Sequence, residues 1–323
     1  MGHAMILVCG HIREPVTELV CARLEAEGLG YRVLSPDASP DPVSQTTVHA
    51  QWSDGDISDF AIVGPDWRLG GDELTGVYFR PVQAPDTSLP GLSAEAAQAI
   101  QAQRLAALSA VLDALPCLVV NPVSASMSNN SKPHQAMLIR ACGFSVPATL
   151  ITNDPSAVLA FAAAHHDDVI YKSVSGIRSI VRRFDAGQAE RLPLLRHGPA
   201  QFQQRIKGAD IRVHVVADQV FATRIETPSI DYRYAASDGQ SIRMRPTELP
   251  AEVAQRCIEL TKQLGLVLAG IDLKQTADGE YFCFEANPSP GFLFFERATD
   301  QPISTALAYL LAGKRFSESS PRL

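Results

Sequence analysis

Short apolar runs and helically spaced apolar positions alternate along the first third of the chain. Residues 5–9 (MILVC) form a continuous apolar run, and helical spacing over 16–24 follows before glycines at 28 and 30. Further runs predict strands at 31–34, 60–63 and 117–120, and an Ala- and Leu-rich stretch predicts a helix over 93–115. This alternation indicates a small parallel sheet. Residues 35–59 are polar and rich in turn formers, so we expect a loop there.

The remaining pattern predicts two further units, of which the last is rich in strands. In the middle of the chain we expect helices at 132–142 and 155–164 and strands at 149–152 and 168–172. Later we expect strands at 211–216 and 220–225, a helix at 250–264 and then a hairpin. The fold class is therefore α/β, with α+β character. The expected units are 1–120, 121–204 and 205–315, followed by a tail at 316–323.

Composition narrows the class of protein. The chain has 323 residues, 28 Lys plus Arg and 35 Asp plus Glu, a formal charge of −7 that argues against a general nucleic-acid binder. Its six cysteines are scattered without a CxxC pair, which is typical of reduced thiols in a cytoplasmic protein. We also see no membrane-spanning run and no signal peptide. No GxGxxG follows the first strand, so a dinucleotide site there is not expected.

The pair Asp278-Gly279 lies between two alternating runs and predicts a tight hairpin. If these two residues are the whole loop, counting outward pairs Leu273 with Phe284, Asp272 with Glu285, and Gly270 with Asn287. Side chains alternate between the faces of a strand. The apolar face would then carry Ile271, Leu273, Phe282, Phe284 and Ala286, with Gln275, and the polar face would carry Asp272, Lys274, Cys283, Glu285 and Asn287.

Two carboxylates directly opposite each other are destabilising unless something positive bridges them. Asp272, Glu285 and the amide of Asn287 supply hard oxygen ligands, which suit Mg²⁺ held jointly with substrate phosphates. Gly270, opposite Asn287, would leave room for a ligand. The alternative is a solvated polar face on which Lys274 neutralises one carboxylate. A loop of three or five residues would break the pairing, so the inference depends on the turn.

Asp272 together with 285–291 (EANPSPG) resembles the magnesium-binding end of ATP-grasp ligases, in particular the RimK-like branch and the macrocyclases of microviridin-type peptides, the graspetides. Four more segments resemble the family in order and spacing: 131–135 (SKPHQ), 143–155 (GFSVPATLITNDP), 170–172 (IYK) and 203–212 (QQRIKGADIR). The resemblance covers residue 118 to the C-terminus. More weakly, 76–80 (GVYFR) resembles the pre-ATP-grasp domain of these maturases.

This resemblance implies an ATP-grasp fold. It consists of an N-terminal Rossmann-like pre-ATP-grasp domain, a small central lid domain and a C-terminal mixed-sheet domain, with ATP between two sheets. By the same resemblance, Mg²⁺ is bound by Asp272, Glu285 and Asn287. The nucleotide is bound by Lys132 and Lys172 at the phosphates, Ser175 and Gly176 in the covering loop, Gln204, Arg205 and Ile206 at adenine, and Lys207 and Asp210 near the ribose. Arg212 and Arg224, on neighbouring strands, would hold the transferred phosphoryl group and the acyl phosphate, and Arg233 would bind substrate. The covering loop, 173–179, has one glycine where the family loop is glycine-rich.

The implied activity is that of an ATP-dependent carboxylate–amine or carboxylate–alcohol ligase that works through an acyl phosphate. The substrate is expected to be a peptide or an amino acid. Two alternatives stay open at this point: a small-molecule dipeptide ligase, and an ATP-binding module without ligase activity. The complete set of Asp272, Glu285 and Asn287 argues against the second of these. We expect no nucleic-acid or membrane partner, and a homodimer is an expectation from the family alone.

Overall fold

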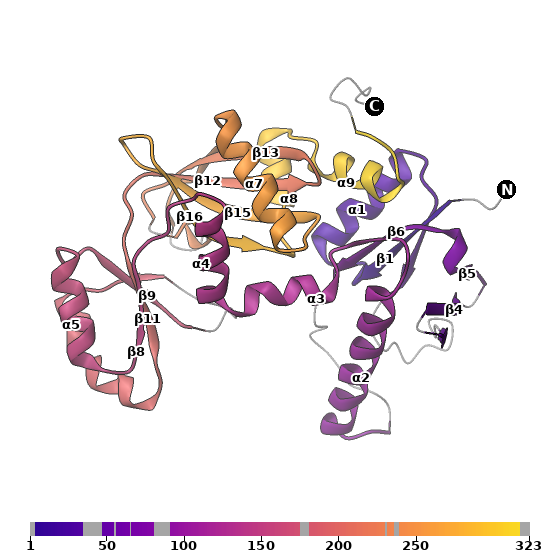
Figure 1. The fold of residues 1–323 in the computed structure, drawn as a ribbon, viewed down its shortest axis with the longest axis horizontal. Helices are drawn as coiled ribbons and strands as arrows, with labels where there is room; N and C mark the ends of the chain where they lie inside the picture. The colour runs from indigo at the N-terminus through magenta and orange to yellow at the C-terminus, as the bar shows by residue number, and fades with distance from the viewer. Residues whose placement is uncertain are drawn as a thin grey trace.

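The computed structural model describes residues 4–34, 47–54, 56–64, 66–80, 91–174, 181–229, 231–235 and 239–316. Figure 1 shows a lobe around β8, β9, β11 and α5 at one end, the largest sheet in the middle, and the N-terminal elements with the projecting helix α2 at the other end. The predicted residues Ser175 and Gly176 and the tail beyond 316 lie outside the described residues.

The N-terminal unit is built on a parallel sheet in the order β2-β1-β6-β7. Its elements are β1 (Met5–Gly10), α1 (Pro15–Ala26), β2 (Tyr31–Leu34), β6 (Leu74–Arg80), α2 (Ala94–Asp113) and β7 (Leu118–Val120). Helix α1 begins where Glu14 accepts a bond from the Thr17 amide at 2.7 Å and Pro15 takes the first helical position. The predicted parallel sheet and both long helices are confirmed.

Residues 47–63 differ from the expectation, and residues 35–46 of the expected loop lie outside the described residues. The strands β3 (Thr47–Ser53) and β4 (Asp56–Val63) form a separate antiparallel sheet with β5 (Arg68–Gly70), in the order β3-β4-β5. Hence 60–63 is not the third strand of the parallel sheet, and that place belongs to β6, after the turn η2 (Gly71–Glu73). β3 is mostly exposed, so its sequence lacks the apolar alternation that marks a strand.

The central lobe is a four-stranded sheet in the order β10-β9-β11-β8, with antiparallel pairs throughout. Val158, Val169 and Phe202 belong to the core between this sheet and α5. Its elements are β8 (Thr149–Thr152), α5 (Pro155–Ala164), β9 (Val169–Lys172), β10 (Arg182–Arg183), α6 (Ala186–Ala189), η4 (Leu192–His197) and β11 (Ala200–Gln204). The chain reaches it through α3 (Val123–Ser126), η3 (Met127–Asn130) and α4 (Lys132–Ala141).

The C-terminal sheet has the order β14-β13-β12-β15-β16. Although a mixed sheet was expected, its named strands are all antiparallel, and a parallel bridge joins Ser145 to Phe282. Its elements are β12 (Ala209–Val216), β13 (Gln219–Glu226), η5 (Tyr232–Tyr234), β14 (Arg243–Pro246), α7 (Ala251–Gln263), β15 (Leu268–Gln275), β16 (Tyr281–Asn287), α8 (Leu293–Thr299) and α9 (Ile303–Leu311). Ile139 of α4 packs into the core under this sheet together with α7, although residue 139 falls within the expected central unit.

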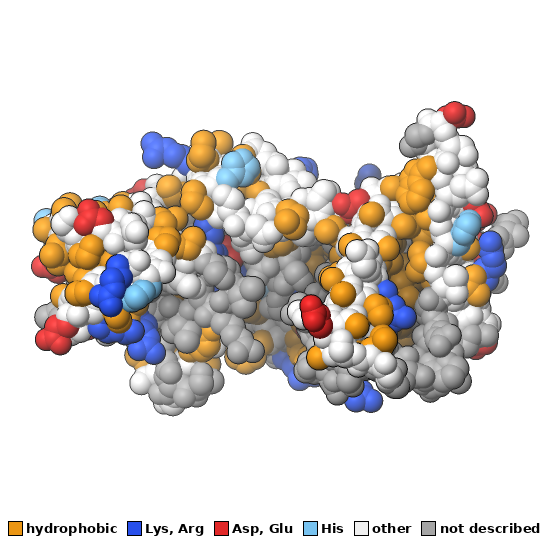
Figure 2. Space-filling model, turned by 90° about the horizontal axis from the view of Figure 1, so that it is seen from below, with side chains coloured by type: hydrophobic (Ala, Val, Ile, Leu, Met, Phe, Trp, Pro, Cys, Tyr) orange, Lys and Arg blue, Asp and Glu red, His pale blue; other side chains and the backbone are white. Residues whose placement is uncertain are grey.

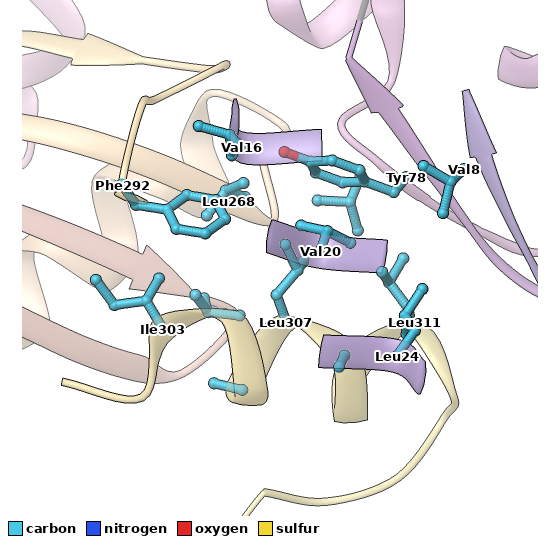
Figure 3. Packing of buried hydrophobic residues seen from close by; sticks show 14 of the residues in the cluster. Val8, Val16, Val20, Leu24, Tyr78, Leu268, Phe292, Ile303, Leu307 and Leu311 are labelled. Atoms are coloured by element: carbon cyan, nitrogen blue, oxygen red, sulfur yellow. The ribbon is translucent and has the colours of Figure 1, made fainter. Parts of the chain in front are cut away.

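One hydrophobic core is shared by the N-terminal and C-terminal units. Figure 3 shows Val16, Val20 and Leu24 of α1 facing Leu307 and Leu311 of α9, and the same cluster takes in Tyr78 of β6 and Phe292. Because both units bury apolar side chains in this cluster, they are packed as one body at this junction.

The surface and the helices add two observations. On the face drawn in Figure 2, Lys and Arg side chains lie among acidic and apolar ones, and several of them gather on the lobe at the left. Among the described residues, no helix has the length and apolar character needed to cross a membrane.

Candidate active site

The metal end of the predicted hairpin forms as expected, but the turn end does not. Asp272 pairs with Glu285 and Gly270 with Asn287, whereas Leu273 pairs with Cys283, because a β-bulge shifts the register between Asp272 and Leu273. The connection spans 276–280, and the amide of Glu280 donates to Thr276 Oγ1 at 3.0 Å. The longer turn and the bulge each shift the register by one residue and compensate each other.

The bulge corrects the predicted faces of the hairpin. Cys283 is 1% exposed and belongs to the hydrophobic core, so it does not lie on the polar face. Phe284 is half-buried and lines the cavity beside Lys132 and Lys172, so it does not belong to the core face. Phe282, now opposite Lys274, is half-buried as well. An extra residue in one strand reverses the faces on the turn side of the bulge.

Asp272 is held in place by two donors. Arg212 Nη1 and the Tyr232 hydroxyl both donate to Asp272 Oδ1 at 2.9 Å, while no described residue donates to Oδ2. Arg212 is 6% exposed and lies over the Phe295 ring. A Cβ on Gly270 would clash with Arg212 Nη2. The space beside Gly270 therefore holds the Arg212 guanidinium. The prediction from the sequence that this space would admit a ligand is wrong.

Glu285 is joined to α4, since Lys132 Nζ lies 3.1 Å from Glu285 Oε2. Lys172 comes from the lobe opposite and lines the same cavities. Burial, together with the positive charge of Lys132, lowers the pKa of Lys172 to about 8. A site that lowers the pKa of a lysine in this way favours an anion, because an anion restores the protonated form.

A cavity of about 300 Å³ lies between the central lobe and the C-terminal sheet. It is lined by Lys172 and Gln203 of the lobe, by the connection from Arg205 to Gly208, and by Asp210, Arg233, Asp272 and Glu285. Gln203 is 5% exposed, and its Oε1 has no partner among the described residues. A buried acceptor of this kind costs free energy unless a ligand donates to it. The exocyclic amine of adenine is such a donor.

Only some of the residues predicted to bind adenine and ribose line this cavity. Gln204 ends β11 and does not line the cavity, and the Arg205 amide already donates to the Asp168 carbonyl at 2.9 Å. Ile206 and Lys207 line the cavity, and Lys207 Nζ lies 3.2 Å from Asp168 Oδ2. Asp210 pairs with Lys274 at 2.9 Å, and burial raises the pKa of its carboxyl.

Of the three predicted arginines, Arg212 and Arg233 lie at the cavity end of the sheet and Arg224 does not. Arg233 lines the cavity, and its Nη2 donates to Asp231 Oδ2 at 2.6 Å. Arg224 pairs in register with Ile211, on the sheet face opposite Arg212 and Asp272. Its Nη1 donates to Gln275 Oε1 at 3.3 Å. The strand alternation thus separates two arginines that lie on neighbouring strands.

Sequence reasoning missed Gln203 and Tyr232. Gln201 and Gln203 alternate with the buried Phe202 along β11, and this alternation was a readable signal for a polar face. The contact of Tyr232 with Asp272 could not be predicted, because it joins residues 40 positions apart.

The two carboxylates and one amide would fill only part of an octahedral Mg²⁺ shell and would leave its other positions to phosphate oxygens and water. In the described ranges, no group of three His, Cys, Asp or Glu side chains could hold a metal ion alone. Asp272 Oδ2 is free of donors from the described residues, and Glu285 has one cationic partner, Lys132. This donor set matches magnesium shared with a phosphate ligand.

Comparison with known proteins identifies the family. The model of the RimK-like ATP-grasp domain matches residues 198–311. A solved structure of the ATP-grasp ligase PsnB with a precursor variant, Mg and ADP is 31% identical and covers 95% of this chain and 97% of its own, with a TM-score of 0.76. The chain belongs to the ATP-grasp ligases. The expected fold and the resemblance to the RimK-like branch are thereby confirmed.

Other relatives of this ATP-grasp ligase are more distant or shorter in overlap. Macrocyclase MdnC from Microcystis aeruginosa, bound with its precursor peptide, is 23% identical, covers 96% of this chain and all of its own, and shares the fold with a TM-score of 0.80. A probable alpha-L-glutamate ligase 2 of Shewanella amazonensis is 30% identical, covering 36% of this chain and 39% of its own. Mouse N-acetylaspartylglutamate synthase A is 34% identical, and the match covers 36% of this chain and 31% of the mouse protein. The chain thus spans under two-fifths of the length of these two curated relatives.

Proposed function

We propose that this ATP-grasp ligase joins the carboxylate of a peptide or amino acid to an amine or hydroxyl, using ATP. The observation that carries the proposal is the cavity between the two sheets, which Lys172, Asp272 and Glu285 line. Lys132 contacts Glu285, Arg212 contacts Asp272, and Asn287 lies two residues beyond Glu285 on the same strand. Cations that bind phosphate and oxygens that bind a divalent ion occur there together.

In the first step, an oxygen of the substrate carboxylate attacks the γ-phosphorus of ATP, and the bond to the β-γ bridging oxygen breaks. ADP leaves, and an acyl phosphate forms. In the second step, an amine or hydroxyl attacks the acyl carbon, phosphate leaves with the electron pair of the C–O bond, and the attacking group loses its proton. The products are an amide or ester, ADP and phosphate.

The residues of the chain act by position and charge. Lys132 and Lys172 would bind the phosphates, Gln203 Oε1 would accept from the adenine amine, and Arg212 would stabilise the transferred phosphoryl group. Asp272, Glu285 and Asn287 would hold Mg²⁺, which neutralises charge on the phosphates when bound. Ser175 and Gly176 would keep their predicted roles at the phosphates, whereas Arg224, on the opposite face of the sheet, is given no role at the acyl phosphate.

Among substrates, we favour a peptide. The support is the whole-length similarity to PsnB, whose solved structures hold a minimal precursor, and the matching fold of MdnC with its precursor peptide. Arg233, exposed in part at the rim of the cavity, would bind an acidic side chain of that peptide. A cytoplasmic location, a homodimer and the absence of nucleic-acid partners remain predictions.

The test is ADP release from Mg²⁺-ATP with pooled amino acids or short acidic peptides, with hydroxylamine added to trap an acyl phosphate. We expect substrate-dependent ADP and hydroxamate, both lost in Glu285→Gln. The matched control is Glu252→Gln, since Glu252 is an exposed glutamate at the start of α7. ATP binding without turnover on any pool would favour a binding module or a dedicated peptide, and absence of ATP binding would refute the proposal.

A further inference from the structure

The segment that follows Asn287 is held by an arginine from the other end of the sequence. Arg80, the last residue of β6, donates from Nη1 to Ser289 Oγ at 3.0 Å and to the carbonyls of Ser289 at 3.3 Å and Pro290 at 3.1 Å. Arg80 is 9% exposed, although it is a charged residue. A buried guanidinium that meets three acceptors on one short segment fixes the position of that segment.

Glu14 orients the guanidinium of Arg80 from behind. Arg80 Nε donates to Glu14 Oε2 at 3.0 Å, and Nη2 donates to Glu14 Oε1 at 3.1 Å. Glu14 is in turn fixed at the start of α1 by the amide and hydroxyl of Thr17. Arg80 thus connects a carboxylate of the N-terminal unit with a loop of the C-terminal unit. Bonding to both at once requires the planar guanidinium of Arg, because the single ammonium of Lys cannot donate in both directions with the same geometry.

Ser289 connects this contact to a predicted metal ligand. The Ser289 amide donates to Asn287 Oδ1 at 2.9 Å, so the direction of the Asn287 side chain depends on where Ser289 lies. Asn121 holds the residue between them, with its Nδ2 at 2.5 Å from the Pro288 carbonyl. Arg80 and Asn121 therefore fix the segment that directly follows Asn287 at the end of β16.

We propose that Arg80 is a positioning residue for the divalent-cation site, acting through Ser289 on Asn287. The inference rests on the proposed function, since it needs a cation bound at Asp272, Glu285 and Asn287. It gives the N-terminal unit a part in the site, although none of the residues described in that unit lines the cavity. The core that the two units share, which includes Phe292 in Figure 3, holds Arg80 and the segment after Asn287 in a constant relative position.

The experiment is a titration of the full chain with Mn²⁺ in the presence of a non-hydrolysable ATP analogue, with free Mn²⁺ measured by electron paramagnetic resonance. We expect Arg80→Met to weaken Mn²⁺ binding about tenfold, and Arg80→Lys to weaken it less. Arg13→Met, which removes an exposed arginine of the same unit, should leave it unchanged. Thermal melting of each variant checks the fold, and Arg80→Lys serves if Arg80→Met does not fold.

A double-mutant cycle separates positioning from a general structural role. If Arg80 acts through Asn287, Arg80→Met should weaken Mn²⁺ binding no further in an Asn287→Ala background. The same tenfold loss in both backgrounds, or no loss in either, overturns the inference and leaves the proposed function standing. Absence of Mn²⁺ binding in the unmodified chain overturns the cation site itself, and this inference with it.

Discussion

Lys172 shows how one residue at the site depends on its ligand. Its pKa of about 8 in the free protein reflects burial and the neighbouring Lys132. Phosphates would raise this pKa, so below pH 8 the lysine is charged before and after binding, and nucleotide affinity should not change with pH. Above pH 8 the free lysine loses its proton, and affinity should fall by up to about tenfold per pH unit.

Calorimetry with an ATP analogue between pH 7 and 9 measures this dependence, and buffers of different ionisation enthalpy reveal the expected proton uptake. Lys172→Arg is the control, because arginine stays protonated and should abolish the decline above pH 8. A decline of equal slope in Lys172→Arg would assign the titration to another group.

Gln203 should determine which base the site accepts. Its unpartnered Oε1 can accept from the 6-amino group of adenine and would face the 6-carbonyl oxygen of hypoxanthine. We expect ATP to bind about tenfold or more tightly than ITP, and Gln203→Leu to remove most of that preference, since leaving one buried acceptor unpaired costs roughly 1–3 kcal/mol. Gln204→Leu, outside the cavity lining, is the matched control. An unchanged ATP-to-ITP ratio in Gln203→Leu would contradict this role.

At the scale of elements, the pairing of β12, β15 and β16 sets the site. Gly270 lies between His214 and Asn287 in register, and Arg212 crosses over it to reach Asp272. This crossing needs a residue without a side chain at position 270. The hairpin therefore tolerates its arginine–aspartate pair only because of one glycine.

Gly270→Ala should displace Arg212 and lower both stability and activity. Overpacking between the new Cβ and the Arg212 guanidinium is expected to cost about 1–3 kcal/mol of unfolding free energy, and ADP release should fall at least tenfold. Gly279→Ala is the control, because Gly279 has φ of +88° with open space around it. It should lose roughly 1–2 kcal/mol of stability and keep its rate of ADP release. Equal rates in the two variants would show that Arg212 does not depend on this space.

At the scale of the whole molecule, the shared core of α1 and α9 predicts that the N-terminal and C-terminal units unfold together. Leu307→Ala, at a position with 0% exposure, should lower the free energy of unfolding by about 2–5 kcal/mol. The two tryptophans, Trp52 and Trp67, both lie in the N-terminal unit and report its unfolding, although residue 307 lies in the C-terminal unit. Urea unfolding is followed by tryptophan fluorescence and by far-UV circular dichroism. The midpoint of the transition in Leu307→Ala should be lower than in the unmodified chain by the same amount in both signals.

Leu159→Ala provides the comparison, because Leu159 is 52% exposed on α5 and its loss should change stability by less than about 0.5 kcal/mol. If Leu307→Ala shifts the circular dichroism transition and leaves the fluorescence transition in place, the two units unfold separately.

Much of the fold could be read from local patterns. The strands at 5–9, 31–34 and 117–120 and the helices at 93–115, 132–142 and 155–164 appear close to their predicted bounds, because each has a continuous apolar run or a helical period. β3 could not be read in this way, since its side chains are mostly exposed and its sequence therefore lacks the apolar alternation that marks a strand, although it forms a hairpin with the neighbouring β4.

The sequence by itself determined the order of the elements, the family motifs, and the pairing of Asp272 with Glu285, because these depend on neighbours in the chain and on a hairpin closed within 18 residues. Only the tertiary structure decided that Gln203 faces the cavity, that Arg224 lies on the opposite face, and that Arg80 reaches Ser289 across 209 positions. These contacts join segments that are distant in the chain. Their physical reason is that the packing of the sheets sets burial and strand register, and these in turn determine which polar side chains lie close enough to bond.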